Sequence, residues 1–134
     1  MKTNKIDDRG LLRRQTRQQA ETKGRRSEAL AAQWLSDLGY QILGQRLRTA
    51  SGEIDLVVQN ETVLAFVEVK ARASEAAGLY AISPRQRQRL VAAATILLAA
   101  HPEWQRPDIR FDVIVLAGEA LSHWPAAFRA DDAV

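Results

Sequence analysis

Two strongly apolar segments of the chain carry charged side chains inside runs that otherwise have the character of buried β-strands. The first reads Glu-Ile-Asp-Leu-Val-Val from Glu53, and the second reads Phe-Val-Glu-Val-Lys from Phe66. Successive side chains of a strand point to opposite faces of its sheet. The alternation therefore predicts that Asp55, Glu68 and Lys70 share one face, opposite the aliphatic side chains. Two acids and a lysine on one sheet face indicate a metal site.

The connection between the two runs decides how closely the acids approach. With a two-residue turn, Asp55 lies diagonal to Glu68, and with a four-residue loop it lies directly opposite Glu68. A three-residue loop would instead place them on different faces. Either of the first two registers brings the carboxylates within roughly 4.5 to 8 Å of each other. Glu53 has the parity of Asp55 and is expected on the same face.

Converging acids need a positive charge between them. Two carboxylates ~4 Å apart repel by about 1 kcal/mol in water and about 4 kcal/mol in a partly buried site. One lysine cannot neutralise several acids, whereas a divalent cation can. The chain has no cysteine, and carboxylate oxygens without a neighbouring histidine favour Mg²⁺ or Mn²⁺ over Zn²⁺. The alternative is the solvated outer face of an antiparallel sheet, which alternates apolar and charged residues in the same way.

An amphipathic helix is expected before these strands, over residues 24–38, with Gly39 as its C-terminal stop. Its apolar stripe comprises Leu30, Ala31, Trp34, Leu35 and Leu38. Glu28 lies on the border of this stripe, where a glutamate can reach the rim of the core. An ordinary boundary glutamate that extends to water is the alternative.

A second helix follows the acidic strands and has a clear start signal. Ser83 is expected as N-cap, Pro84 at the first helical position and Gln86 closing a capping box, with the helix running to about Ala100. This orientation could aim Gln86 at the acidic face, and a role limited to capping is the alternative. Its uncharged part, from residue 90 to residue 100, is far too short to cross a bilayer, so no membrane association is expected.

The remaining strands are expected at Tyr40 to Arg48, Ile109 to Leu116 and Ala120 to Trp124. Asp112 would either bond locally or support the acidic site. His123 lacks a partner spacing typical of a zinc site or catalytic triad, which predicts a surface or satisfied core histidine. Together the elements predict an α/β fold with a mixed central sheet flanked by helices, formed by residues 24–134.

The positive charge is concentrated in an N-terminal arm, predicted over residues 1–23 and flexible or partly helical. Residues 1–26 hold nine Lys or Arg against three acids, and the rest of the chain holds ten against thirteen. Basic arms commonly neutralise nucleic-acid phosphates, and a solubilising tail is the alternative. No apolar secretion signal is present in this segment, so a cytoplasmic location is expected. The candidate phosphate contacts are Arg13, Arg14, Arg17, Arg25 and Arg26.

The acidic residues combine into a pattern that resembles the restriction-endonuclease-like superfamily: an acid on a helix, then Asp, then Glu-x-Lys. The matching segments are Glu28, Gly52-Glu53-Ile54-Asp55-Leu56 and Val67-Glu68-Val69-Lys70. The chain looks closest to the YraN-like proteins, a bacterial family similar to archaeal Holliday junction resolvases. The resemblance extends from about residue 24 to residue 124 and implies a restriction-endonuclease-like three-layer fold.

The resemblance also implies roles for single residues. Asp55 and Glu68 would ligate the metal, with the Val69 carbonyl as an additional ligand and Glu28 bound directly or through water. Lys70 would position or help deprotonate the attacking water and offset charge on the scissile phosphate.

Two further residues have alternatives of their own. Arg72 shares the parity of Lys70 and could touch phosphate, although a solvated surface arginine is the common case. Glu53 would support the metal ligands or serve as a structural partner of Arg46 or Arg48.

The function predicted from the sequence is a Mg²⁺- or Mn²⁺-dependent endonuclease that hydrolyses phosphodiester bonds in DNA, with branched or junction DNA as a candidate substrate. RNA stays open as an alternative nucleic acid, and a homodimer stays open as the assembly. The alternative is a non-catalytic nucleic-acid-binding or protein-interaction module that keeps the fold. Retention of Asp55, Glu68 and Lys70 favours the enzyme, because a module that only bound the nucleic-acid backbone would gain affinity by losing acids.

Overall fold

A computed structural model describes residues 24–130 of the chain. The arm predicted over residues 1–23, with Arg13, Arg14 and Arg17, lies outside the described residues. The elements are a first helix described over residues 24–37, β1 (Gln41–Thr49), β2 (Gly52–Gln59), β3 (Val63–Ala71), α2 (Glu75–Tyr80), α3 (Pro84–Ala100), the short 3₁₀ helix η1 (Pro102–Trp104), β4 (Asp108–Ala117) and β5 (Ala120–Phe128).

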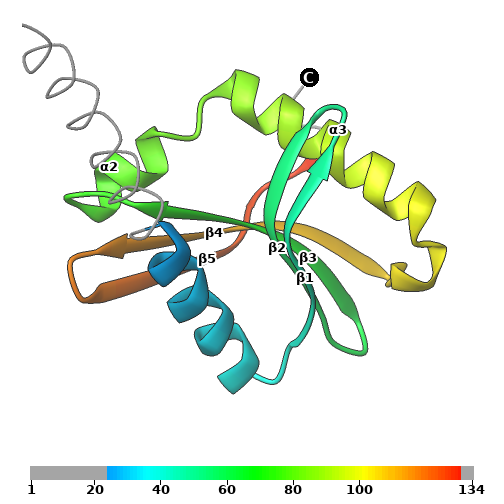
Figure 1. Ribbon diagram of the computed structural model, residues 1–134, viewed down its shortest axis with the longest axis horizontal. Coiled ribbons are helices and arrows are strands. Elements are labelled where there is room, and N and C mark those ends of the chain that lie inside the picture. Colours follow the sequence, from blue (N-terminus) through cyan, green and yellow to red (C-terminus); the bar gives the residue numbers. More distant parts are fainter. Residues whose placement is uncertain (1–23, 131–134) are drawn as a thin grey trace, which may run out of the picture.

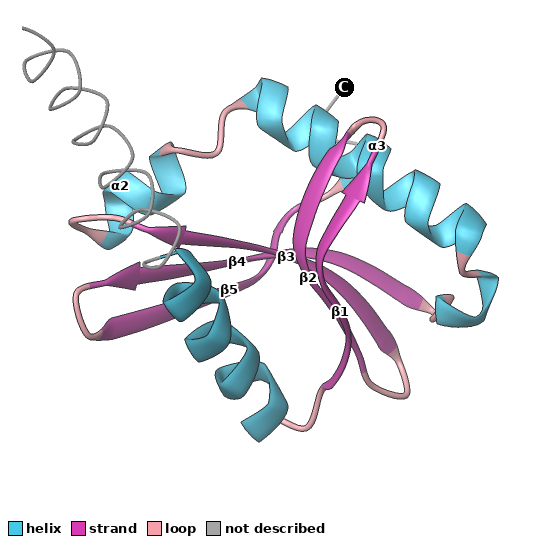
Figure 2. Cartoon of the chain, in the orientation of Figure 1, coloured by secondary structure: helices cyan, strands magenta, loops and turns pink. Residues whose placement is uncertain are grey.

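The strands form one five-stranded sheet in the order β1-β2-β3-β4-β5. Neighbouring strands are antiparallel except β3 and β4, which are parallel and joined through α2 and α3. A parallel pair needs such a crossover connection, which here places helices over one face. The first helix lies on the other side of the sheet (Figures 1 and 2). The predicted α/β class with a mixed sheet between helices is confirmed.

Both faces of the sheet are covered by apolar packing. On one face, α3 contributes Leu90, Ala93, Ala94 and Leu97 to a cluster with sheet residues that include Phe66 and Val113. On the other, Ala31, Ala32 and Leu35 of the first helix pack on residues that include Val67 and Ile114. Because helices cover both faces, the strands have apolar side chains on both sides.

The first helix is buried along a narrower stripe than the sequence predicts. The expected core residues Leu30, Trp34 and Leu38 are 47, 41 and 53% exposed. They are spaced four residues apart and form a ridge beside the contact stripe, because the helix meets the sheet through the small side chains of Ala31 and Ala32. The prediction was right about the helix and wrong about part of its buried face.

The β2–β3 hairpin has the four-residue connection. Gln59 pairs with Leu64 and Leu56 with Val67, a register that sets Asp55 opposite Glu68. The Asn60 side chain stabilises the loop, since its Oδ1 accepts the backbone N–H groups of Thr62 at 3.0 Å and Val63 at 2.8 Å.

Beyond Leu56 the two strands separate. The pairing of β2 with β3 ends at Leu56 and Val67, while β1 and β2 stay paired to Thr49 and Gly52. The β1–β2 hairpin therefore leaves the sheet plane, and its tip extends toward α3 (Figure 1). A gap opens beside β3 at the level of Glu68.

The start of α3 follows the prediction in part. Ser83 is the N-cap and its Oγ accepts the Gln86 N–H at 3.1 Å, and the helix ends at Ala100 as expected. The side chain of Gln86, however, does not return to Ser83 to complete a capping box. Within residues 24–130, no helix is long and apolar enough to cross a membrane.

Two features went unpredicted. Helix α2 follows a Ser74 N-cap and packs so closely on β4 that a Cβ at Gly78 would lie 2.4 Å from Val115 Cγ1. Strand β5 continues past Trp124 to Phe128, which is buried and pairs with Phe111. Pro125 disfavours a continuing strand in sequence reasoning, but an irregularity in the pairing and the burial of Phe128 allow it.

Candidate active site

The acids of the two strands converge on the α3 side of the sheet, in the gap where β2 leaves β3. Asp55 Oδ2 accepts the backbone N–H of Val69 at 2.8 Å. The carboxyl groups of Asp55 and Glu68 also interact through a side-chain hydrogen bond. The Glu68 side chain is only 8% exposed, so the solvated outer face considered as the alternative does not describe this position.

The backbone of Val69 adds an oxygen to the same gap. In an extended strand the N–H and C=O of one residue point to the same side. Because the Val69 N–H binds Asp55, its carbonyl faces the side from which Asp55 approaches. Three oxygen-bearing groups, from Asp55, Glu68 and Val69, thus surround the gap.

Lys70 is held beside Glu68 from two directions. Its Nζ lies 3.4 Å from Glu68 Oε1, and its side chain is 14% exposed. Gln86 reaches it from α3. With its amide oriented to satisfy both partners, Gln86 accepts from Lys70 Nζ at 3.0 Å and donates to the Ala81 carbonyl at 3.1 Å. The Gln86 side chain therefore positions the ammonium group beside Glu68 instead of completing a capping box.

Crowding of buried acids shifts their protonation. Burial, followed by the neighbouring Asp55 charge, raises the pKa of Glu68 to about 8, and Lys70 only partly opposes this shift. Burial also raises the pKa of Asp55, against the hydrogen bond from the Val69 N–H. The direction of the hydrogen bond follows: protonated Glu68 donates to Asp55. Protonation of Glu68 reduces the repulsion between the two carboxylates, as a bound cation would.

Glu28 is engaged by a residue that sequence reasoning assigned elsewhere. Arg46 Nε donates to Glu28 Oε2 at 2.5 Å, and the Glu28 side chain is 14% exposed. The hydrogen bond to Glu28 raises the pKa of Arg46, with further contributions from the charges of Glu53 and Asp55. The structure thus links Glu28 to the acidic strands through Arg46 rather than by direct contact.

Arg46 has an unusual backbone conformation for a strand residue. Its φ is 52°, in the left-handed region that costs a non-glycine residue of order 1–3 kcal/mol. The flanking residues Gln45 and Leu47 keep their pairing with β2, so the left-handed conformation is local to Arg46. No local sequence signal predicts it, because Arg46 is neither glycine nor asparagine.

Glu53 forms an ion pair with Arg48, one of the two structural partners expected for it. Arg48 Nε lies 3.4 Å from Glu53 Oε2, and the Glu53 side chain is 39% exposed. In the part of the chain that the structure describes, no group of three or more His, Cys, Asp or Glu side chains is arranged to hold a metal ion. The groups that fit a cation are the two carboxylates and the Val69 carbonyl, an all-oxygen set suited to Mg²⁺ or Mn²⁺.

Asp112 lies on the opposite face of the sheet. It pairs with Val67 of the first-helix cluster, whereas Glu68 pairs with Val113 of the α3 cluster. Its carboxylate accepts from Arg110, from His123 at 2.9 Å and from the Ala126 N–H at 3.0 Å. Local bonding therefore describes Asp112, and the structure does not bring it to the acidic site.

His123 is a satisfied histidine, as expected. Its Nε2 faces Asp112, and its Nδ1 accepts the indole N–H of Trp34 at 3.2 Å. Both ring nitrogens are thus occupied by partners on the first-helix face.

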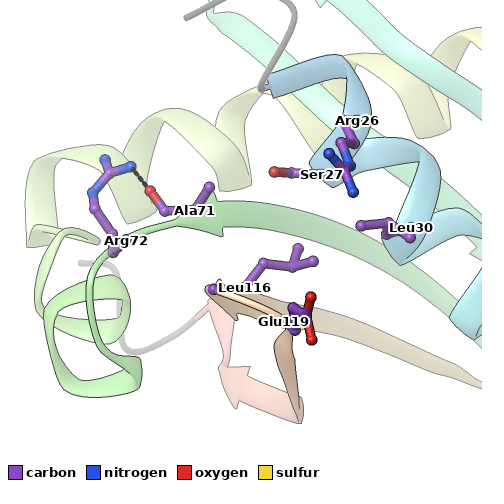
Figure 3. A pocket seen from close by; sticks show the side chains of 8 residues that line it. Arg26, Ser27, Leu30, Ala71, Arg72, Leu116 and Glu119 are labelled. Atoms are coloured by element: carbon purple, nitrogen blue, oxygen red, sulfur yellow. Dashed lines mark hydrogen bonds between the residues drawn. The ribbon is translucent and has the colours of Figure 1, made fainter.

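Three of the arginines predicted to bind nucleic acid, Arg25, Arg26 and Arg72, belong to the part of the chain that the structure describes. Arg26 and Arg72 line a cavity of about 540 Å³ beside the first helix and the ends of β3 and β4 (Figure 3). Arg72 Nη1 donates to the Ala71 carbonyl at 2.8 Å, and Arg25 is exposed. Glu119 on the same cavity wall offsets part of the positive charge.

The fold and this site define a class: an α/β protein with a mixed five-stranded sheet that holds a half-buried Asp, a buried Glu and a lysine in a gap between strands. Residues 27–116 match Uncharacterised protein family UPF0102, and the chain belongs to that family. Membership confirms the resemblance to the YraN-like proteins.

Similar proteins occur in several bacteria. A UPF0102 protein of Acidiphilium cryptum is 51% identical over 116 residues, which cover 87% of this chain and 91% of the relative. One of Rhodopseudomonas palustris is 48% identical, covering 80% and 83%. One of Granulibacter bethesdensis is 47% identical, covering 84% and 72%. The similarity spans the whole acidic site.

Proposed function

We propose that this protein is a Mg²⁺- or Mn²⁺-dependent endonuclease that hydrolyses phosphodiester bonds in DNA, with branched or junction DNA as a substrate to be tested first. The observation that carries the proposal is the buried Glu68, with the half-buried Asp55 and Lys70 beside it. The resemblance to the restriction-endonuclease-like superfamily and to Holliday junction resolvases supports the same activity.

The surroundings of the acid pair support a cation site. The half-buried Asp55 faces the buried Glu68, and the nearby ammonium group cannot balance both. Such a pair is unfavourable unless one acid is protonated or a cation is bound. The oxygens of Asp55, Glu68 and Val69 would hold the metal, which when bound lowers the pKa of water and stabilises negative charge on a phosphate.

Each remaining residue has a task that its contacts permit. Gln86 fixes Lys70 between Glu68 and the first turn of α3. From there the Lys70 ammonium can orient an attacking water and offset charge on a bound phosphate. Arg46 holds Glu28 near the acids of β2, so Glu28 can reach the site only through water or after release from Arg46.

One observation favours the second candidate, a non-catalytic nucleic-acid-binding or protein-interaction module. Among residues 24–130 no three acids are arranged as a metal cluster, and Glu28 is held by Arg46. A module of this kind would bind DNA without cleaving it under any metal.

The deciding experiment incubates the purified full chain with duplex, single-stranded and four-way-junction DNA in Mg²⁺ or Mn²⁺, with EDTA as a parallel arm. The proposal expects cleavage that Asp55→Asn and EDTA abolish and that Lys70→Gln lowers by about 100-fold or more. Glu61→Gln is the matched control, because Glu61 is exposed in the loop between β2 and β3.

Calorimetric titration with Mn²⁺ provides a readout independent of activity. The parent and Glu61→Gln should bind the ion, whereas Asp55→Asn and Glu68→Gln should bind it weakly or not at all. DNA binding without cleavage in every metal, together with no ion uptake, would replace the nuclease by the module.

A further inference from the structure

A cleft lies between the tip of the β1–β2 hairpin and the first turns of α3, two segments that approach each other above the sheet (Figure 1). It encloses a volume of about 340 Å³. Its lining residues are Gly52, Glu53, Ser83, Arg85, Gln86, Arg89 and Leu90.

The cleft leads to the acidic site. Gln86 lines it and also binds Lys70 Nζ at 3.0 Å. Gly52 brings the hairpin backbone beside α3, because a Cβ built there would lie 3.9 Å from Arg89 Cβ. A chain that occupied the cleft would therefore pass within one side-chain length of the Lys70 ammonium.

Positive charge dominates the cleft. Arg85 and Arg89 are one helical turn apart, so they project from the same side of α3, and both are exposed. Arg48 on the hairpin does not line the cleft, but its Nε lies 3.4 Å from Oε2 of the lining residue Glu53. Glu53 is the one acid among the cleft's described lining residues, and Arg48 offsets it.

The chemistry of the lining selects phosphates over bases. None of the described residues that form the cleft is aromatic, so stacking on bases has no platform there. Exposed guanidinium groups contact phosphate oxygens and fix the position of a nucleic acid without reading its sequence.

We propose that this cleft binds the sugar-phosphate backbone of DNA next to the scissile phosphate, with Arg85 and Arg89 each contacting one phosphate. The inference rests on the proposed nuclease function and extends it with two positioning residues and a sequence-independent mode of binding. The larger cavity of Arg26 and Arg72 is a weaker choice, because Lys70 and Gln86 do not line it.

The test measures DNA affinity as a function of salt. Full-length protein is titrated onto a labelled duplex in EDTA between about 50 and 200 mM salt. Each phosphate contact contributes about 0.9 to the slope of log affinity against log salt. Arg85→Gln/Arg89→Gln should therefore lower the slope by about 2, whereas the charge-preserving Arg85→Lys/Arg89→Lys should keep the parental slope.

Gln88→Ala is the matched control, because Gln88 is exposed on α3 and does not line the cleft. It should keep the parental slope, and a duplex of scrambled sequence should bind the parent equally well. Arg26→Gln/Arg72→Gln tests the competing cavity and should lower the slope less than the α3 substitutions. An unchanged slope in Arg85→Gln/Arg89→Gln, a larger loss in Arg26→Gln/Arg72→Gln, or no binding by the parent overturns the inference.

The two proposals fail in distinguishable ways. A parent that cleaves DNA while Arg85→Gln/Arg89→Gln keeps its slope and turnover overturns the cleft alone. A parent that binds through these arginines but cleaves under no metal overturns the nuclease and leaves the binding surface.

Discussion

Two buried carboxylates on opposite faces of the sheet show how differently one fold can treat the same chemical group. Asp112, on the first-helix face, accepts hydrogen bonds from Arg110, His123 and Ala126. Glu68, on the α3 face, has Lys70 Nζ at 3.4 Å and the charge of Asp55 beside it. The Asp112 carboxylate accepts four hydrogen bonds, which fill its acceptor sites, whereas the Glu68 carboxyl group faces another acid.

The pKa values of the two groups move in opposite directions. Burial acts to raise the pKa of Asp112, but the hydrogen bonds from His123, Arg110 and Ala126 outweigh it and lower the value. At Glu68, burial and the Asp55 charge raise the pKa to about 8. The fold supplies Asp112 with hydrogen-bond donors but leaves the charge of Glu68 poorly balanced. A functional role therefore explains Glu68 better than a packing role.

Removing the charge of Asp112 is expected to have the largest effect on stability, and it tests whether this carboxylate stabilises the fold. Asp112→Asn leaves Arg110, whose side chain is 16% exposed, without its anionic partner. We expect the free energy of unfolding to fall by about 3–5 kcal/mol, the usual cost of breaking a buried pair. Urea denaturation measures it. Asp37→Asn, at an exposed acid bonded to Gln33, is the control, and a loss no greater than in this control would refute the structural role of Asp112.

The same kind of substitution at Glu68 should have the opposite sign. In EDTA at pH 7 the folded protein must keep Glu68 protonated, whereas the unfolded chain ionises it freely. Glu68→Gln removes this cost and can still donate to Asp55, so we expect the free energy of unfolding to rise by up to about 3 kcal/mol.

The pH dependence of stability tests whether the ionisation of Glu68 causes the stability gain of Glu68→Gln. Because its pKa is raised from 4.5 to about 8 on folding, the parent loses stability as pH rises through that window. The excess stability of Glu68→Gln should be absent near pH 4 and complete above pH 8. Parallel unfolding curves for parent and variant across this range would contradict the raised pKa.

The smallest effect is expected at Trp34, which bonds His123, the histidine that in turn bonds Asp112. Trp34→Phe removes the indole N–H that His123 Nδ1 accepts at 3.2 Å. We expect a loss of about 0.5–1 kcal/mol in urea denaturation, since Trp34 is 41% exposed. Trp124→Phe, at an equally exposed indole, is the control. A loss equal to that of Asp112→Asn would mean that Trp34, rather than the carboxylate, holds this face together.

Much of the fold followed from local patterns. Apolar alternation placed the strands within one to four residues of their observed ends, and the Ser83 cap placed α3. These signals are local, because a strand's periodicity and a helix cap involve residues only a few positions apart.

Contacts between distant segments escaped prediction. The Arg46–Glu28 pair joins residues 18 apart, and the Trp34–His123 bond joins residues 89 apart. Neither has a signature in spacing, because each depends on how the first helix is laid on the sheet. Exposure of Leu30 and Leu38 has the same origin.

The sequence by itself determined that Glu68 and Lys70 share a face, because side chains alternate along a strand. Whether Asp55 joins them depends on the loop length, and the pairing of Gln59 with Leu64 decided it. Only the tertiary structure decided how far the site is shielded from solvent. The β1–β2 hairpin leaves β3 beyond Leu56 and α3 covers the gap, so the acids are enclosed rather than solvated. Burial depends on elements that pack from elsewhere in the chain, and burial is the main cause of the raised pKa of Glu68.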